Sequence, residues 1–459
     1  MKQILIKNAK EIITMNENRE RLKNADLLIE AGKIKEMGRN ISLEENEELK
    51  IINGRDYFVF PGLINLHHHF YQTLTRSLPE AQEMELFGWL KYLYPIWSNL
   101  TADAVYYSTL LAAGELLKTG CTTTSDHFYV FPRNQADNLL DYEFEAAAEI
   151  GIRFHGSRGS MSLSQKDGGL PPDDVVQTDE EILADSKRLI VKYHDSNPFA
   201  MQRVVLAPCS PFSVTEELML KSTELARQNG VQLHTHLAET KDEEKFVLDK
   251  YGMRPLAYME KLGWLGEDVW YAHAVHLNSS ELEKMAATGT GVSHCPVSNM
   301  KLSSGVALVP EMLNKGVPVG LAVDGSASND SSNMILELKS AFLMHRLIHG
   351  IKSLSAEDVL GLATNGGRDV LNQPEIGSLE LGKAADMFMI NSKRLGWAGG
   401  LYDPVSALIN QGDTQIVDYT IVNGEIVVEK GELTNVDEKE IVEKANNISA
   451  KMCKDILSR

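Results

Sequence analysis

The sequence predicts an α/β protein, a (β/α)₈ barrel of the TIM type with a small β-sandwich formed from both termini. Three observations lead to this fold class. Both ends of the chain are rich in short β patterns, the middle alternates strand-like and helix-like segments, and polar side chains cluster where several predicted strands end. The 459-residue length allows up to three domains, but a barrel reaches this size around one core.

Residues 1–59 are predicted to form the N-terminal part of the β-sandwich. Ile4–Ile6 and Glu11–Thr14 are expected to be short strands. Asp26–Glu30 then turns through Ala31–Lys33, an apolar-turn-apolar pattern that is typical of a hairpin.

Residues 60–375 are predicted to form the barrel, because about eight strand-like runs alternate with helix-like segments, as a (β/α)₈ fold requires. One helix is expected from Thr215 to Asn229, with Gly230 ending it. A doubly wound sheet is the alternative, but no G-x-G-x-x-G turn follows an early strand. The runs are Tyr57–Phe60, Cys121–Ser125, Arg153–Gly156, Arg203–Ala207, Val231–His236, Val269–His273, Gly291–His294 and Val319–Val323.

Residues 376–435 are predicted to complete the sandwich, and residues 436–459 to form an outer helix. Ala385–Ile390 reads as a strand. Asp418–Val422 and Glu425–Val428 flank Asn423-Gly424, a pair that favours a type I′ hairpin turn. The charged amphipathic segment Asp437–Ser458 indicates the helix.

The composition excludes several classes of protein. The formal net charge of −19 disfavours nucleic acid as a partner. No uncharged apolar run reaches the roughly 20 residues that span a bilayer, and Lys7 interrupts the N-terminus before a signal-peptide core forms. Four scattered cysteines without a C-x-x-C pair fit a reducing cytoplasm, so we expect a cytoplasmic protein without membrane association.

Histidines follow two of the predicted strands in pairs. His67 and His69 are two residues apart after the Phe60 strand, so on extended backbone their side chains share one face and suit a metal. His236 closes another strand, and Glu239 follows three residues later, a spacing that suits a catalytic zinc with a nearby carboxylate acid/base. Either feature alone also fits structural histidines and a solvated glutamate.

Two further strand ends carry polar side chains, His273 and Asp324. Alone, His273 fits a structural role, and Asp324 fits a helix cap. Barrel active sites are built at the C-terminal ends of the strands. Because all of these groups fall at such ends, the sequence predicts a metal site there.

The order P-G-x-x-N-x-H-x-H, H-x-x-E, A-H and D-G-S-A-S-N resembles the amidohydrolase superfamily over nearly the whole chain. The resemblance is to the branch that holds cytosine, guanine and adenosine-nucleoside deaminases and triazine hydrolases. By position, it implies that His67, His69, His236 and Asp324 bind one divalent metal, zinc or alternatively iron. It also implies catalytic roles for Glu239, His273 and Asp324: Glu239 as proton shuttle, His273 as a polarising group, and Asp324 as a base.

One departure from binuclear relatives supports a single metal. Those relatives carry a bridging lysine on the fourth strand, and the corresponding stretch here, Val204–Ser210, has none. The segments His69–Arg76, Leu86–Trp97 and Ser125–Pro132 resemble the 8-oxoguanine deaminase group. The resemblance therefore implies hydrolytic deamination of a purine-like ring, with 8-oxoguanine converted to urate and ammonia. The resemblance leaves open whether the protein forms a homo-oligomer.

Four residues are candidate substrate contacts. Gln72 can form paired hydrogen bonds, Trp89 can stack on a ring, Cys209 can line the pocket, and Arg158 can hold a carbonyl oxygen. Ordinary helix packing explains Trp89 equally well, and a surface ion pair explains Arg158 equally well. For Cys209, the role of a small buried apolar residue is favoured over a substrate contact.

Three other functions remain open at this point. A triazine (hydroxyatrazine-type) aminohydrolase or chlorohydrolase, or another nucleobase or nucleoside deaminase, would use the same site. A cyclic amide hydrolase is disfavoured because the fourth-strand lysine is missing. A non-catalytic metal-binding barrel would be expected to have lost a ligand or the acid, yet all six positions are filled.

Overall fold

The computed structural model describes residues 3–43, 48–135, 138–412 and 416–454. Eight parallel strands form a barrel in the order of the chain. Its first and last strands meet where Leu66 N donates to Leu321 O (3.1 Å), which closes the ring. The strands are β6 (Leu63–Asn65), β7 (Cys121–Phe128), β8 (Arg153–Ser160), β9 (Gln202–Pro208), β10 (Gln232–Leu237), β11 (Val269–His273), β12 (Gly291–His294) and β13 (Val319–Leu321).

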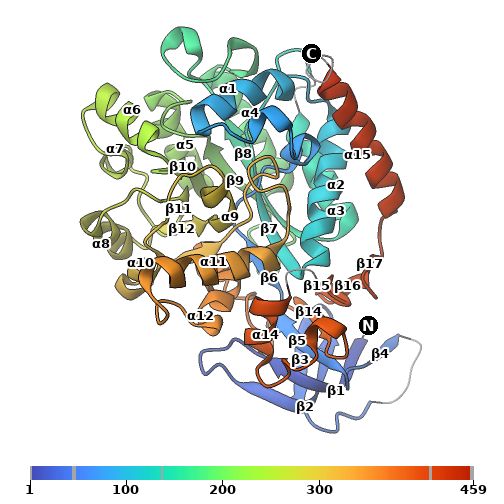
Figure 1. Cartoon of the computed structure of the whole chain (residues 1–459). Coiled ribbons are helices and arrows are strands. Elements are labelled where there is room, and N and C mark those ends of the chain that lie inside the picture. The colour runs from blue at the N-terminus through green and yellow to red at the C-terminus, as the bar shows by residue number, and fades with distance from the viewer. Residues whose placement is uncertain (1–2, 44–47, 136–137, 413–415, 455–459) are drawn as a thin grey trace.

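Helices cover the outside of the barrel, and α1 lies across its upper end in the view of Figure 1. The predicted helix at Thr215 is confirmed, because Thr215 caps α5 by accepting from Leu218 N, and Gly230 ends it with a positive φ of 65°. The helices of this part are α1 (Leu86–Trp97), α2 (Ala102–Lys118), α3 (Leu139–Ile150), α4 (Asp179–Tyr193), α5 (Glu216–Asn229), α6 (Lys241–Tyr251), α7 (Pro255–Lys261), α8 (Ser279–Thr288), α9 (Pro296–Lys301), α10 (Val309–Lys315), α11 (Met334–His349), α12 (Ala356–Gly361) and α13 (Gly367–Val370).

Segments from both ends of the chain form a second β structure below the barrel (Figure 1). Hydrogen bonds connect its nine strands into one mixed sheet, in which β5 pairs with β14 and so joins the two ends. The strands are β1 (Gln3–Ile13), β2 (Arg21–Glu30), β3 (Lys33–Gly38), β4 (Leu49–Asn53), β5 (Tyr57–Pro61), β14 (Met387–Asn391), β15 (Tyr419–Val422), β16 (Glu425–Glu429) and β17 (Glu432–Leu433).

The predicted barrel with a β domain from both termini is therefore confirmed, with two corrections. The run Tyr57–Phe60 belongs to the terminal sheet, and the shorter β6 is the first barrel strand. The predicted strands Ile4–Ile6 and Glu11–Thr14 are parts of one strand, β1, whose register shifts between Ile6 and Ala9. A local bulge broke the apolar pattern there, although the pairing with β2 continues.

The C-terminal elements follow the prediction closely. Asn423 and Gly424 both have positive φ (48° and 79°), as a type I′ turn requires. The helix α14 (Pro404–Gln411) precedes this hairpin, and α15 (Glu438–Met452) lies beside α2 (Figure 1). The end of the predicted helix, residues 455–458, lies outside the described residues.

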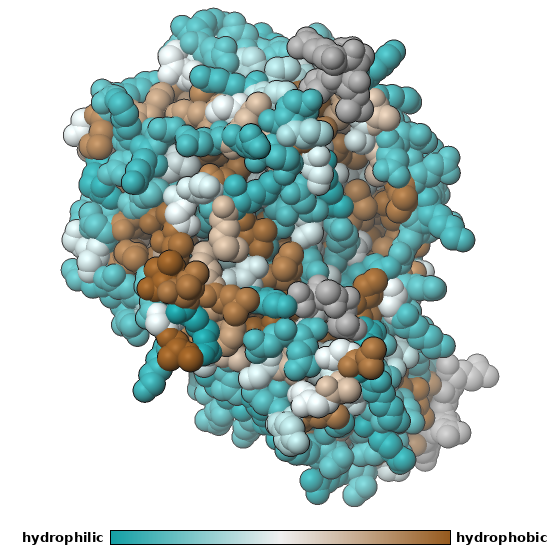
Figure 2. All heavy atoms as spheres, viewed as in Figure 1, coloured by the Kyte–Doolittle hydropathy of each residue, from teal (hydrophilic) through white to brown (hydrophobic). Residues whose placement is uncertain are grey.

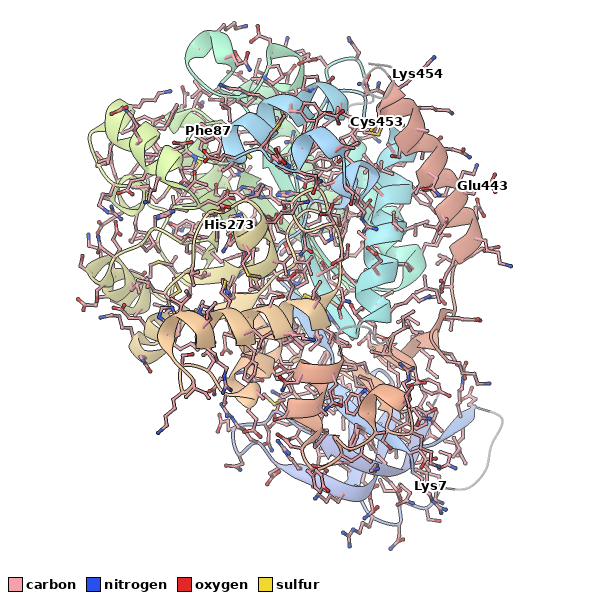
Figure 3. All side chains as sticks on the ribbon, in the orientation of Figure 1. Lys7, Phe87, His273, Glu443, Cys453 and Lys454 are labelled. Atoms are coloured by element: carbon pink, nitrogen blue, oxygen red, sulfur yellow. The ribbon has the colours of Figure 1, made fainter. Side chains whose placement is uncertain are left out.

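A buried ion pair connects the two parts. Arg153 of β8 lies 3.1 Å from Asp386, which precedes β14, and both side chains are almost fully buried. His273 lies in the barrel and Lys7 in the terminal sheet, far from each other in the molecule (Figure 3). The chemistry-bearing residues therefore belong to the barrel.

Hydrophilic residues cover most of the face shown in Figure 2, and apolar residues gather over the region of α10 and α11. Among the described residues, no helix combines the length and apolar character that a membrane crossing needs.

Candidate active site

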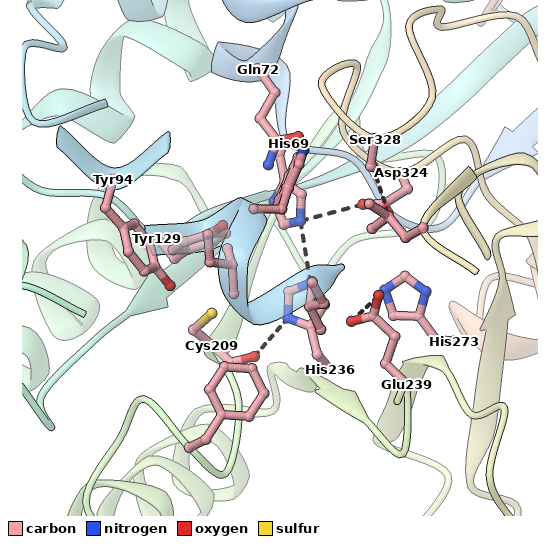
Figure 4. A pocket seen from close by; sticks show the side chains of 15 residues that line it. His69, Gln72, Tyr94, Tyr129, Cys209, His236, Glu239, His273, Asp324 and Ser328 are labelled. Carbon is pink, nitrogen blue, oxygen red and sulfur yellow. Dashed lines mark hydrogen bonds and ion pairs between the residues drawn. The ribbon is translucent and has the colours of Figure 1, made fainter. Parts of the chain in front are cut away.

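Most of the predicted site residues line one cavity at the C-terminal end of the barrel (Figure 4). His69, His236, Glu239, His273 and Asp324 all line it. Gln72, Trp89 and Cys209, the candidate substrate contacts, also line it. The remaining lining residues are Leu86, Leu90, Tyr94, Tyr129, Phe212, Leu302 and Ser328.

Four predicted ligands converge on one point, although by a different local route from the one expected. His67 and His69 follow β6 on a segment that is not itself a strand. They nevertheless both reach Asp324 Oδ1, His67 Nε2 at 3.3 Å and His69 Nε2 at 3.4 Å. His69 Nε2 also lies 3.2 Å from His236 Nε2.

This donor set fits a divalent metal. His67 Nε2 is buried and has no hydrogen-bond partner among the described residues, so its lone pair is available in the centre of the cluster. The ligand atoms of His67, His69 and Asp324 lie within 4.8 Å of one another, as do those of His67, His236 and His273. Three imidazoles and a carboxylate are a donor set that zinc and iron accept.

The second ring nitrogens of two ligands, His69 and His236, form hydrogen bonds with main-chain oxygens. His69 Nδ1 donates to His127 O and His236 Nδ1 donates to Cys209 O, each at 2.7 Å. Each contact leaves Nε2 as the free nitrogen, which is the orientation that a metal ligand needs.

Asp324 presents its two oxygens to different partners. Oδ1 faces His67 and His69, whereas Oδ2 accepts from Ser298 Oγ (2.5 Å) and Ser328 Oγ (3.0 Å). Burial raises the pKa of this carboxyl, but the neighbouring histidines outweigh burial and hold it well below its usual range. Asp324 is therefore an ionised carboxylate.

Glu239 and His273 form the reactive pair beside this cluster. His273 Nε2 lies 3.7 Å from Glu239 Oε2, and His273 Nδ1 lies 2.9 Å from Asn299 Oδ1. Burial raises the pKa of Glu239. Burial lowers the pKa of His273, but the Glu239 and Asp324 charges outweigh that effect and raise it overall. A carboxyl and an imidazole so coupled can exchange a proton.

Left-handed backbone occurs at three of the strand ends that build the site. Ala238, His273 and Asp324 have φ values of 53°, 70° and 63°. Such conformations cost non-glycine residues on the order of 1–3 kcal/mol each and cluster at functional sites. Glu243 holds one of them, because its carboxylate accepts from Ala238 N (2.7 Å) and Glu239 N (2.8 Å).

Arg158 is the one predicted contact that the structure places elsewhere. Its guanidinium bonds Asp185 (2.7 Å) and Gln177 (2.8 Å) and lies over the Phe131 ring. Arg158 does not line the cavity, and its ion pair with Asp185 is buried, not the surface ion pair of the alternative.

The sequence argument did not find the residues behind the site, which are Asn299, Ser298, Ser328 and Glu243. Ser328 lies four residues after Asp324 in the D-G-S-A-S-N motif, so that motif contained the signal. Ser298 and Asn299 lie on α9, and only the folded barrel brings this helix to Asp324 and His273.

Comparisons with known proteins agree with this geometry. The profile of the amidohydrolase family matches residues 58–427. An 8-oxoguanine deaminase of Pseudomonas aeruginosa is 48% identical over 77% of this chain and 78% of its own. A hydroxydechloroatrazine ethylaminohydrolase of Pseudomonas sp. is 37% identical over 93% and 91%.

The fold comparison points to the same group of enzymes. An atrazine chlorohydrolase from Arthrobacter aurescens, solved in complex with zinc, superposes with a TM-score of 0.93 at 32% identity, covering 97% of this chain and all of that chain. From these matches, the chain belongs to the amidohydrolase family and is a hydrolase that acts on carbon–nitrogen bonds.

Proposed function

We propose that the protein is a metal-dependent deaminase of an aminated purine-like ring, with 8-oxoguanine as the first substrate to test. One observation supports this most: His69, His236 and Asp324 line one cavity together with Glu239 and His273, and the fourth proposed ligand, His67, lies directly against them. The similarity to an 8-oxoguanine deaminase suggests the ring.

The cavity suits a flat, neutral heterocycle. Leu86, Leu90, Phe212 and Leu302 supply apolar walls, and a few polar atoms face inward. In the described part of the chain, Gln72 Oε1, Trp89 Nε1 and Tyr94 OH are buried without hydrogen-bond partners. A buried polar atom without a partner costs about 1–3 kcal/mol, so a ring that offers matching edges would relieve this cost.

The residues have distinct roles in the proposed reaction. One divalent ion held by His67, His69, His236 and Asp324 would supply Lewis-acid activation of a water molecule. Glu239 accepts a proton from that water and delivers it to the ring nitrogen beside the attacked carbon. The new bond joins the water oxygen to the carbon that carries the amine.

The second half of the reaction breaks the carbon–nitrogen bond. His273 donates a hydrogen bond to the developing charge, and Asn299 holds its opposite nitrogen. Asp324 takes the second proton of the water and passes it to the departing amine, so that water and 8-oxoguanine become urate and ammonia. The two serines on Oδ2 keep the carboxylate in place for this transfer.

A triazine aminohydrolase is the second candidate. The similarity to a hydroxydechloroatrazine ethylaminohydrolase supports it, and the apolar cavity walls can accept an alkylamine. Both reactions would use the same ligands and acid/base pair.

The test is a panel of aminated purines, pyrimidines and triazines with purified protein. Ammonia release from 8-oxoguanine in preference to the other rings supports the proposal, and ethylamine release from hydroxyatrazine would favour the second candidate. Elemental analysis completes the test. We expect one metal equivalent per chain, since no lysine is among the described residues that line the cavity. A protein without metal would refute both candidates.

A further inference from the structure

One further histidine, His234, contacts the ring of the proposed ligand His67 inside the barrel. His234 lies on β10, two residues before His236. His234 Nε2 is 2.7 Å from His67 Nδ1, and His234 Nδ1 is 3.0 Å from Trp270 O. Its ring stacks on the Trp270 indole at 4.5 Å and is fully buried.

The Trp270 carbonyl determines where the protons lie. A carbonyl oxygen only accepts, so His234 Nδ1 must carry the hydrogen and His234 Nε2 must be an acceptor. His67 Nδ1 then donates to His234, which leaves His67 Nε2 unprotonated. The opposite arrangement would set an imidazole lone pair against the Trp270 oxygen.

His67 differs in this respect from the other two histidine ligands. His69 and His236 are oriented directly by main-chain oxygens, of His127 and Cys209. In the described part of the chain, His67 is oriented through the side chain of another histidine. The orientation of the His67 ring therefore depends on the side chain of His234, which a substitution can remove.

We propose that His234 is a positioning residue that fixes the tautomer and ring orientation of His67 and thereby sets the metal affinity of the site. The inference rests on the proposed metal-dependent function. Partners of this kind typically change metal affinity 10–100-fold when they are removed.

Two variants of His234 separate this role from simple packing. In His234→Gln, the amide oxygen can reach the position of Nε2 and still accept from His67 Nδ1. In His234→Asn, the amide can keep the contact with Trp270 O but is too short to reach His67. His155→Asn is the matched control, because His155 is also a buried barrel histidine and its ring bonds only Gln373 among the described residues.

The measurement is the zinc dissociation constant of each folded protein, by competition with a chromophoric chelator. We expect His234→Asn to bind zinc about 10–100-fold more weakly, and His234→Gln and His155→Asn to bind close to wild type. The absorption spectrum of cobalt-loaded protein should change in His234→Asn alone. Thermal unfolding of each apoprotein shows whether a variant is folded.

Two results would overturn the inference. One is wild-type zinc affinity in folded His234→Asn. The other is equal weakening in the Gln and Asn variants, which would mean that His234 acts only through packing. A wild-type protein that takes up no zinc or other divalent metal would instead refute the metal site itself, and the proposed function with it.

Discussion

The two walls of the active-site cavity differ in how their polar atoms are satisfied. On the wall of histidines, His69, His236 and His273 each have a second ring nitrogen bonded to a protein oxygen. The second wall consists of Gln72, Trp89 and Tyr94, and its atoms Gln72 Oε1, Trp89 Nε1 and Tyr94 OH are buried without a hydrogen-bond partner among the described residues.

The difference indicates that one wall serves the reaction and the other serves substrate binding. The histidine wall is preorganised by the fold, because strand ends, left-handed turns and serine hydroxyls fix each reactive atom. The second wall carries polar atoms without a partner among the described residues, so a bound ring can supply one. Substitutions on the first wall should therefore affect turnover, and substitutions on the second should affect substrate binding.

Glu239→Gln gives the strongest test of this contrast. The amide cannot shuttle a proton, so we expect kcat to fall by at least about 10²-fold. Metal content should stay at one equivalent, because Glu239 is not among the proposed ligands. Turnover by ammonia release and metal by elemental analysis are the two measurements. Near-normal turnover would remove Glu239 from its role.

Trp89→Phe and Tyr94→Phe test the second wall. Tyr94→Phe removes the hydroxyl and keeps the ring, whereas Trp89→Phe removes the Nε1–H together with part of the indole. We expect KM to rise about 5–10-fold per variant, the worth of one hydrogen bond, with kcat little changed. Trp397→Phe is the matched control, because Trp397 Nε1 is also buried without a partner but lies outside the cavity. A loss of kcat without a change in KM would contradict the division between the walls.

His155→Asn gives the smallest effect and concerns stability alone. Burial lowers the pKa of His155 to about 3, whereas an unfolded histidine titrates near 6.5. Between these values only the unfolded chain binds the proton, so wild-type stability falls as the pH drops from about 6.5 toward 3. The variant lacks this group and should lose less stability.

Denaturation midpoints at pH 7 and pH 4.5 measure the effect. An equal fall in wild type and His155→Asn would show that His155 does not contribute to the acid sensitivity. The kinetic constants at pH 7 should stay unchanged, because His155 does not line the cavity.

Much of the fold could be predicted because periodicity and turn chemistry are local. Thr215 and Gly230 bound α5, and Asn423-Gly424 forms its turn, as their residue types require. The run Tyr57–Phe60 was assigned to the wrong sheet because a buried strand has the same composition in either place. Only its pairing with β14, more than 300 residues later, decides the matter.

The site was predictable where residues sit at strand ends, and unpredictable where helices deliver them. His236, Glu239, His273 and Asp324 reach the cavity because parallel strands end on one side of the barrel. The side chain of Arg158 could not be placed, since its direction depends on Asp185 of α4. The supports of Asp324 and His273 come from α9, which no spacing in the sequence connects with them.

The union of both chain ends in one sheet has a consequence for synthesis on the ribosome. Pro61 of β5 pairs with Met387 of β14, about 325 residues further along. At about 5–20 residues per second, the edge of β5 waits roughly 15–65 s for its partner strand. During that interval, the backbone N–H and C=O groups on one edge of β5 lack their partner strand. Cellular quality-control factors can therefore bind these N-terminal strands before β14 is made.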